Sequence, residues 1–422
     1  MRYDDEIYSL LLFVAAVFVF HSSAHAGPYS LEVIAEVGDV IDGRTIIQFS
    51  RDPAPVAINN DGEVAFFAKV SSAQGEGWSV MTQNRFIAGA GKLVDGRLPF
   101  FNDEDHGVDI NNLGQVTYTA FLPEGSRGLF VDETLLVQPG DVIDGITLGE
   151  FGRNPAINDR GTVAFQGSEV GRGWSIFTQN RLVVENGRVY DGHTMVSFSD
   201  LHINNAGEIV FGARSSNAHI DAVLTPDRIV AIAGGTIDGR PVFQLRDIGG
   251  ISDSGEVLFV ALSCAPCPAV PNTLVEYVAT EDRVLLEIPG ELDGVPLDNI
   301  WGEDIITNRD LDFAILGAFE REDGSFQKIL FGDGKRVVAE GDVIDDKVIR
   351  RLRINFDISD RGDVAFRAQF EDLSRAVIVA RAIPEPDAIM LATIALIAFV
   401  CIRQRRLRRA ARHHVRHHLK GR

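Results

Sequence analysis

The sequence predicts an all-β fold: a seven-bladed β-propeller closed by its own N-terminal strand. Three observations support this prediction. A nine-residue motif, clearest at residues 157–165 (INDRGTVAF), recurs along the chain, an Asp-Gly pair recurs about every fifty residues, and the two ends of the repeat array are complementary parts of one repeat. A repeat of about fifty residues with four strands has the size of one propeller blade.

Each copy of the motif is predicted to form a β-hairpin. A short polar residue suits the start of a type I turn, an Asn or Asp follows it, and a Gly such as Gly62 then supplies the positive φ that a type I turn with a bulge needs. An alternating apolar run, such as Val64, Phe66 and Ala68, follows the turn. The copies begin at Ile58, Ile110, Ile157, Ile203, Ile251, Ile358 and, in a degenerate form, Ile306.

Two features of the motif carry further expectations. The degenerate copy has Asp310 where Gly is expected and one extra residue before Phe313, and Asp adopts a positive φ less readily, so we expect a distorted turn there. The Asn at the second position of four copies either lines one opening of the ring or caps its own turn, and we favour capping. These residues are Asn59, Asn111, Asn158 and Asn204.

Four strands are predicted in each repeat. In the third repeat they are residues 155–158, 162–167, 174–178 and 181–185, with Gln179-Asn180 as the turn between the last two. A second turn ending in Asp-Gly follows each fourth strand, and successive Asp positions differ by 53, 49, 47, 47, 55 and 52 residues. The pairs begin at Asp42, Asp95, Asp144, Asp191, Asp238 and Asp293, with Asp345-Asp346 as the last.

The two ends of the repeat array predict a closed ring. Residues 31–35 form a fourth strand with no preceding three, and residues 356–359, 363–368 and 376–380 form three strands with no fourth. Together they make one blade, which gives seven. Closure by the N-terminal strand removes the exposed sheet edges that an open array would have to cap. The strand order and the motif resemble NHL-type and related propeller repeats, and this resemblance implies the fold alone.

Residues 1–26 are predicted to be a secretory signal peptide. An apolar run at residues 10–20 precedes Ala24-His25-Ala26, a small-residue cleavage site before Gly27. The acidic residues at positions 4–6 depart from the usual basic start. An uncleaved anchor is the alternative, although about eleven apolar residues are too few to span a bilayer comfortably. Residues 27–383 would then be the propeller, and residues 384–422 a separate tail.

The tail has three parts in a fixed order. Pro384-Glu385-Pro386 comes first, an apolar segment at residues 388–402 follows, and an Arg-rich run ends the chain. This order resembles the PEP-CTERM sorting signal. The resemblance implies an exosortase-like partner that cuts near the triplet, and an exported protein of the cell envelope or biofilm matrix. A transmembrane helix with its basic end in the cytoplasm agrees with the charge rule for membrane topology. The alternative is a permanent single-span anchor that is never cut.

Charge is distributed unevenly along the chain. The formal net charge is −20, but residues 403–422 contain eight Arg, one Lys and no acid, so everything before them carries −29. So acidic a body repels nucleic-acid phosphates and attracts cations or cationic partners. Solubility alone is the simpler explanation of this charge.

The sequence predicts no cofactor and no metal site. The Asp-Gly pairs, with Asp39, Asp141 and Asp342 nearby, could hold Ca²⁺, but turn formation is the favoured explanation. Cys264 and Cys267 are predicted to form a local disulfide in an inserted loop. A redox-active pair and half of a zinc site are the alternatives.

No catalytic motif is present, and we favour a role without enzymatic activity. The predicted function is an exported surface or matrix interaction module whose partner is a glycan or a protein. The alternatives are a secreted polysaccharide lyase or hydrolase and a purely structural spacer. An enzyme would need convergent carboxylates, for which residues 103–105, Glu303 and Asp304 are the local candidates. Trp78, Trp174 and Trp301 could stack on sugars, but packing between blades is favoured.

Overall fold

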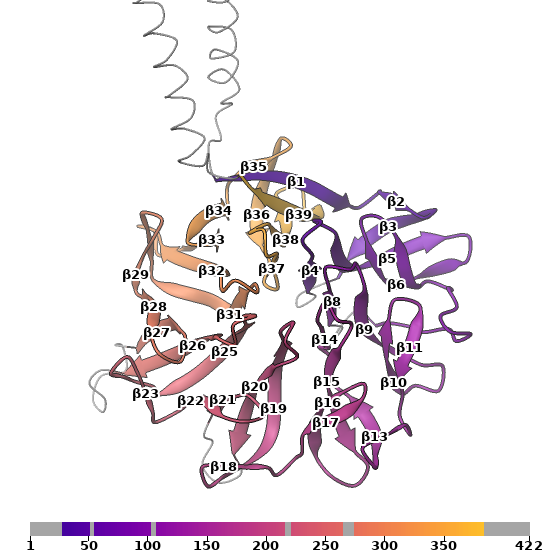
Figure 1. Cartoon of the computed structure of the whole chain (residues 1–422). Helices are drawn as coiled ribbons and strands as arrows, with labels where there is room; N and C mark the ends of the chain where they lie inside the picture. Colours follow the sequence, from indigo (N-terminus) through magenta and orange to yellow (C-terminus); the bar gives the residue numbers. More distant parts are fainter. Residues whose placement is uncertain (1–27, 51–54, 103–106, 216–220, 265–273, 384–422) are drawn as a thin grey trace, which may run out of the picture. The chain divides into compact units, whose positions relative to one another are not determined.

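The computed structural model describes residues 28–50, 55–102, 107–215, 221–264 and 274–383. In this part of the chain the strands form seven blades arranged around one axis (Figure 1), and the propeller prediction is confirmed. In two of the blades the short outer hairpin is a separate two-stranded sheet. Each blade is antiparallel and, apart from the N-terminal strand that closes the last blade, uses neighbouring strands of the chain. The described residues include no helix that could cross a membrane.

The first four blades follow the chain in order. Blade 1 consists of β2 (Val40–Ile41), β3 (Arg44–Phe49), β4 (Val56–Ile58), β5 (Val64–Ser72), β6 (Gly75–Thr82) and β7 (Phe86–Gly89), and blade 2 of β8 (Val108–Ile110), β9 (Val116–Phe121), β10 (Arg127–Val131) and β11 (Thr134–Val137). Blade 3 consists of β12 (Val142–Ile143), β13 (Ile146–Phe151), β14 (Ala156–Ile157), β15 (Val163–Glu169), β16 (Trp174–Thr178) and β17 (Arg181–Val184). Blade 4 consists of β18 (Val189–Tyr190), β19 (His193–Ile203), β20 (Ile209–Ser215), β21 (Asp221–Leu224) and β22 (Ile229–Ile232).

The last three blades repeat the plan. Blade 5 consists of β23 (Thr236–Ile237), β24 (Arg240–Pro241), β25 (Gln244–Ile251), β26 (Val257–Cys264), β27 (Leu274–Ala279) and β28 (Val284–Ile288). Blade 6 consists of β29 (Gly290–Leu292), β30 (Val295–Leu297), β31 (Asn299–Thr307), β32 (Phe313–Glu320), β33 (Phe326–Gly332) and β34 (Lys335–Ala339). Blade 7 contains β35 (Val343–Ile344), β36 (Lys347–Leu352), β37 (Asp357–Ile358), β38 (Val364–Phe370) and β39 (Arg375–Ala382).

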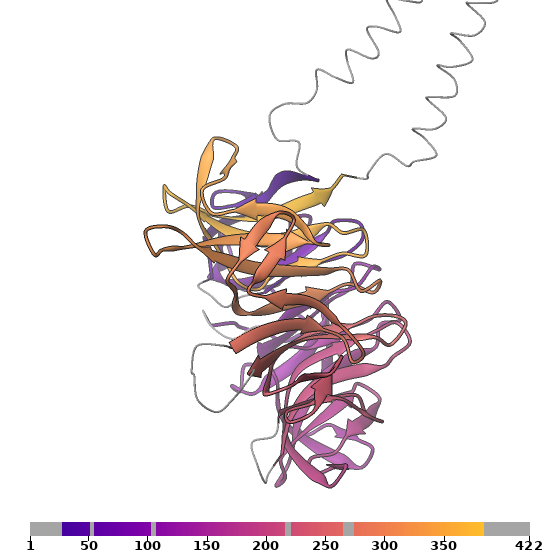
Figure 2. The same cartoon turned by 90° about the vertical axis from the view of Figure 1, so that its left-hand side faces the viewer.

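The N-terminal strand completes blade 7, as predicted. Strand β1 (Tyr29–Glu36) pairs antiparallel with β39, so that Leu31 faces Ala380 and Ala35 faces Val377. The two strands lie side by side in both ribbon views (Figures 1 and 2). The Tyr29 hydroxyl donates a hydrogen bond to the Gly332 carbonyl of blade 6 at 2.9 Å, which ties the closing strand to its neighbour.

The Asp-Gly pairs form hairpin turns, which confirms their interpretation as turns. In blade 3 the pair connects β12 to β13, with φ of 50° at Asp144 and 80° at Gly145. Positive φ at both residues defines a type I′ turn, the two-residue turn that suits the twist of a hairpin. The Asp144 carboxylate also accepts a hydrogen bond from the Leu182 N–H of β17 at 2.7 Å. The same bond to the outer strand is accepted by Asp42 from the Phe86 N–H and by Asp293 from the Arg336 N–H.

The repeated motif forms the predicted turn. In blade 1 the Gly62 N–H donates to the Asn59 carbonyl at 2.9 Å, and φ is 73° at Gly62. The register predicted for the degenerate copy is wrong by one residue. Asn308 takes the place of Asn59, and Leu311, with φ of 74°, takes the place of the Gly. The turn keeps its shape, but the hydrogen bond that closes it is longer, at 3.4 Å.

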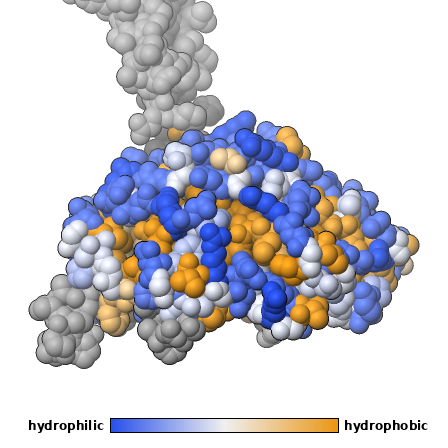
Figure 3. Space-filling model, turned by 60° about the horizontal axis from the view of Figure 1, so that its bottom comes forward, coloured by the Kyte–Doolittle hydropathy of each residue, from blue (hydrophilic) through white to orange (hydrophobic). Residues whose placement is uncertain are grey.

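The hydrophobic core lies between neighbouring blades. One cluster, for example, joins Phe66 and Ile46 of blade 1 to Ala365 and Val377 of blade 7. Trp78 and Trp301 are partly buried against such clusters, which agrees with the packing role expected of them. Apolar residues also reach the outer surface, where a broad hydrophobic band lies between hydrophilic areas (Figure 3). The exposed valines of the short hairpin strands are Val40, Val142, Val189 and Val343.

Candidate functional site

The innermost strands bring the repeated turns together at the propeller axis. These strands are β4, β8, β14, β19, β25, β31 and β37 (Figure 1). The motif therefore fixes two sets of axial side chains. The seven residues at its third position form what we call the axial ring, and the residues just before its first position form the inner tier. The axial ring consists of Asn60, Asn112, Asp159, Asn205, Asp253, Arg309 and Asp360.

The buried residue at the second position of the motif stabilises the turn that carries each axial-ring residue. The Asn158 side-chain oxygen accepts hydrogen bonds from the Arg160 and Thr162 N–H groups of its own turn, at 3.1 and 3.0 Å, which confirms the capping role predicted for it. Its amide nitrogen donates to the Asn204 carbonyl of blade 4 at 2.9 Å. The same bond between blades is made by Asn59, Asn111, Asn204 and Asn308.

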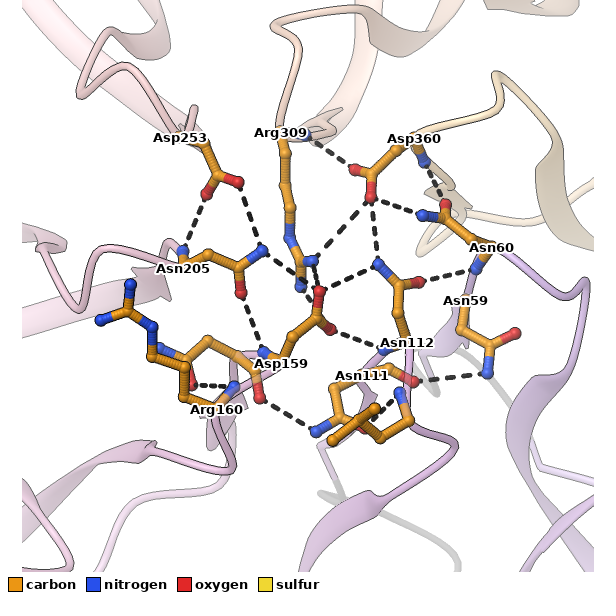
Figure 4. A network of polar contacts seen from close by, with 12 residues as sticks. Asn59, Asn60, Asn111, Asn112, Asp159, Arg160, Asn205, Asp253, Arg309 and Asp360 are labelled. Atoms are coloured by element: carbon orange, nitrogen blue, oxygen red, sulfur yellow. Dashed lines mark hydrogen bonds and ion pairs between the residues drawn. The ribbon is translucent and has the colours of Figure 1, made fainter.

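The axial ring is a circle of hydrogen bonds (Figure 4). At six of the seven junctions the backbone N–H of one member donates to the side-chain oxygen of the next, at distances between 2.7 and 3.1 Å. Arg309 has no such oxygen, and at that junction the Asp253 N–H donates to the Arg309 carbonyl at 3.0 Å instead. The third position of the motif therefore closes the ring.

Arg309 lies across the ring and plugs it. Its guanidinium reaches from blade 6 to the Asp159 carboxylate of blade 3, with Nη2 at 3.1 Å from Oδ1 and Nη1 in contact with Oδ2, and Nη1 lies 3.9 Å from Asp360 (Figure 4). Burial acts to raise the pKa of Asp159, but the hydrogen bonds and charge of Arg309 outweigh it and hold this pKa below its usual value. Asn112 and Asn205 also donate to Asp159.

Behind the ring, two cavities meet at the inner tier. A narrow cavity of about 120 Å³ lies against the ring, and a wide cavity of about 440 Å³ continues from it along the axis. Asp109, His202 and Asp357 are the charged or titratable side chains that line both cavities. The other members of the tier are Ala57, Ala156, Gly250 and Ile306.

The polar side chains of the inner tier connect adjacent blades. Asp109 accepts hydrogen bonds from its neighbour Ile110 and from the Ile157 N–H of blade 3, each at 2.8 Å. Asp357 does the same with Ile358 and with the Ile58 N–H of blade 1, again at 2.8 Å. His202 Nε2 lies 3.0 Å from the Ile248 carbonyl of blade 5, and because a carbonyl only accepts, the proton is on Nε2.

Burial dominates the ionisation of all three groups. It raises the pKa of Asp109 to about 6, against hydrogen bonds from two backbone N–H groups that lower it. It raises the pKa of Asp357 to about 8, and the nearby charge of Asp109 adds to this rise. It lowers the pKa of His202, which is therefore neutral at pH 7. At neutral pH the two carboxyl groups thus hold about one proton between them.

The other predicted site residues lie elsewhere. Pro384, Glu385, Pro386, Cys267 and residues 103–105 are outside the described residues. Cys264 ends β26, and Glu303 and Asp304 belong to β31. Within the described ranges, no group of three or more His, Cys, Asp or Glu side chains is arranged to hold a metal ion.

Comparison of the sequence with family models and with curated proteins gave no match. Among solved structures, the chain is similar to BBS1N from a complex with ARL6DN (7% identity, 85% of this chain and 97% of that one, TM-score 0.38). It is also similar to the β-propeller domain of the Trilobed protease from Pyrococcus furiosus, described as having an open velcro topology (11% identity, 79% and 83%, TM-score 0.34). Because these identities and TM-scores are low, no property of these proteins is inferred for this chain, and its fold is assigned from its own strand pairing.

Proposed function

We propose that the chain is an exported interaction module of the cell surface or extracellular matrix, and that its partner is a glycan or a protein. The observation that carries this proposal is the wide axial cavity of about 440 Å³, which lies behind a ring plugged by Arg309. A concave site that combines apolar walls with fixed polar groups is the usual form of a binding pocket. Its apolar wall residues include Val56, Val108, Ile248 and Phe356.

The two ends of the sequence support export. The signal-peptide pattern at residues 1–26 would direct secretion, and the tail would hold the protein at the membrane until an exosortase-like enzyme cuts near Glu385. Because Tyr29 pairs with Ala382, both segments join the propeller at the same place in blade 7. Cell fractionation followed by mass determination of the mature chain tests this part. Mature protein that keeps both ends and stays in the cytoplasm would contradict it.

A secreted polysaccharide-active enzyme is the second candidate, and one observation favours it. Asp109 and Asp357 face the same cavity with pKa values of about 6 and about 8, and glycosidases use carboxyl pairs of unequal pKa. Against this, each of their carboxylate oxygens already accepts a backbone N–H. Both residues therefore have a structural role in joining blades, which is why we place binding first.

A panel of polysaccharides separates these functions. The purified full-length chain in mild detergent is incubated with each polymer, and retention on the immobilised polymer and release of reducing ends are both measured. Retention without turnover is the result expected of a binding module. Turnover would replace this proposal with the enzyme. If neither occurs and no envelope or matrix protein is bound, a structural spacer remains.

A further inference from the structure

The inner tier presents hydrogen-bond acceptors to the cavities. His202 donates through Nε2 to the Ile248 carbonyl, so its Nδ1 is a lone-pair acceptor, and no partner for Nδ1 occurs among the described residues. The His202 side chain is partly buried, and it lines both cavities. Nδ1 can therefore accept a hydrogen bond from a donor group inside the cavities.

The space beside Nδ1 is open because residue 250 is Gly. A Cβ atom at Gly250 would lie 3.7 Å from His202 Nδ1 and 3.0 Å from a methyl carbon of Thr307. Ala57 and Ala156 are the equivalent residues of two other blades, and both are small. The tier therefore leaves room at the axis between its three polar side chains.

Asp109 and Asp357 supply the remaining acceptors. They belong to β8 and β37, which both contact β4 from opposite sides, and the charge of one raises the pKa of the other. Each carboxylate oxygen accepts one backbone N–H and keeps a further lone pair. Arg309 lines the narrow cavity but is already paired with Asp159. A cationic donor is what this arrangement lacks.

We propose that the axial channel binds a primary ammonium group between Asp109, His202 and Asp357, with the rest of the ligand in the wide cavity. This inference rests on the proposed binding function and names the chemistry of its ligand. An ammonium group has three donors, which match the three acceptor side chains. The apolar walls accommodate an aliphatic chain or the face of a sugar ring.

Charge and access agree with a cationic ligand. The wide cavity is lined by the carboxyl groups of Asp109, Asp200, Asp247 and Asp357 and by the single guanidinium of Arg153. A cavity with an excess of one sign of charge concentrates ligands of the opposite sign. Because Arg309 plugs the ring, the ligand enters from the end away from the ring, where Asn154 and Asn355 lie.

The test is calorimetric titration of the full-length chain in mild detergent at pH 7, where the amino groups of both amine probes are mostly protonated. Two pairs of probes are used: n-butylamine hydrochloride against 1-butanol, and D-glucosamine against D-glucose. We expect at least one amine to bind with one site per chain and its neutral analogue to bind at least tenfold more weakly. Binding of butylammonium alone would assign the ligand to alkyl amines, and binding of glucosamine alone would assign it to amino sugars.

Variants locate the site. Asp357→Asn and His202→Phe are expected to weaken amine binding at least tenfold, whereas Asp238→Asn, at an exposed hairpin turn, leaves it unchanged. If Asp357→Asn does not fold by circular dichroism, His202→Phe decides. No heat with either amine on folded wild-type chain would overturn the inference, as would unchanged binding by the folded variants. Binding of glucose as strong as that of glucosamine would also overturn it, but would leave the proposed binding function intact.

Discussion

Substituting Asn158 tests whether the second motif position holds neighbouring blades together. This side chain accepts two hydrogen bonds within its own turn and donates one, at 2.9 Å, to the Asn204 carbonyl of the next blade. The chain itself provides the informative comparison, because Ser stands at the equivalent positions 252 and 359. There the hydroxyl caps the turn but makes no bond to the next blade: Ser252 Oγ, for example, accepts the Glu256 N–H at 3.1 Å.

The structure gives different magnitudes for three substitutions. Asn158→Ser keeps the cap and loses the bond between blades, which is expected to lower the free energy of unfolding by about 1 kcal/mol. Asn158→Ala loses all three hydrogen bonds, and at ~1 kcal/mol each the loss is about 3 kcal/mol. Asn158→Asp keeps the cap but places an oxygen against the Asn204 carbonyl at a buried site, and should be worse than Ser.

The assay is urea-induced unfolding of the full-length chain in mild detergent, followed by tryptophan fluorescence. The midpoint urea concentration is compared for wild type and the three variants, with Asp238→Asn as a control that leaves this network untouched. The expected order of stability is wild type, Ser, then Asp and Ala. Equal stability of the Ser and wild-type proteins would refute the claim that the side chain stabilises the contact between blades.

Three further predictions follow from the axial site and the closing strand. Asp357 and Asp109 keep protons in the folded chain that the unfolded chain loses above pH ~4. The free energy of unfolding is therefore expected to fall by several kcal/mol as pH rises from about 4 to about 8, at ~1.4 kcal/mol per pKa unit. Urea midpoints at pH 5 and pH 8 measure this, and a higher midpoint at pH 8 would contradict it. Arg309→Ala leaves Asp159 without its cation and is expected to lower the free energy of unfolding by about 2 kcal/mol. Arg309→Asn restores the residue type of the ring, so a smaller loss of stability is expected in thermal unfolding. Equal losses of stability for the two variants would argue against the ring. Deleting residues 29–36 exposes the edge of β39 and should cause aggregation in size-exclusion chromatography, and a monomeric, equally stable product would argue against closure.

The fold could be predicted because it depends on periodicity. Turn residues such as Gly62 and Asp144 recur at a blade-sized spacing, and the two incomplete ends add up to one blade. The hairpins between β2 and β3 and between β12 and β13 were anticipated only as turns. Their short strands contain two residues before the turn, too few for an alternating pattern to be recognised.

The axial site could be predicted only in part. The constant Asn or Asp at the third motif position was visible in the sequence, but its role in a closed circle depends on contacts between blades that no local pattern shows. Arg309 was missed because the degenerate copy was aligned one residue out of register, which assigned the third position to Asn308. Asp109, His202 and Asp357 precede the motif at a position that is not constant among the repeats. A closer comparison of that position would have singled them out as polar residues on inner strands.

The contact between the first and last strands of the propeller is open to direct measurement. In a chain whose Cys264, Cys267 and Cys401 are replaced by Ser, Cys is introduced at Ser30 and Arg381, which face each other across β1 and β39. Mild oxidation followed by mass spectrometry of tryptic peptides is expected to show an intramolecular disulfide between these two positions in most of the protein. If they remain reduced, or link only separate chains, then the N-terminal strand does not close the seventh blade.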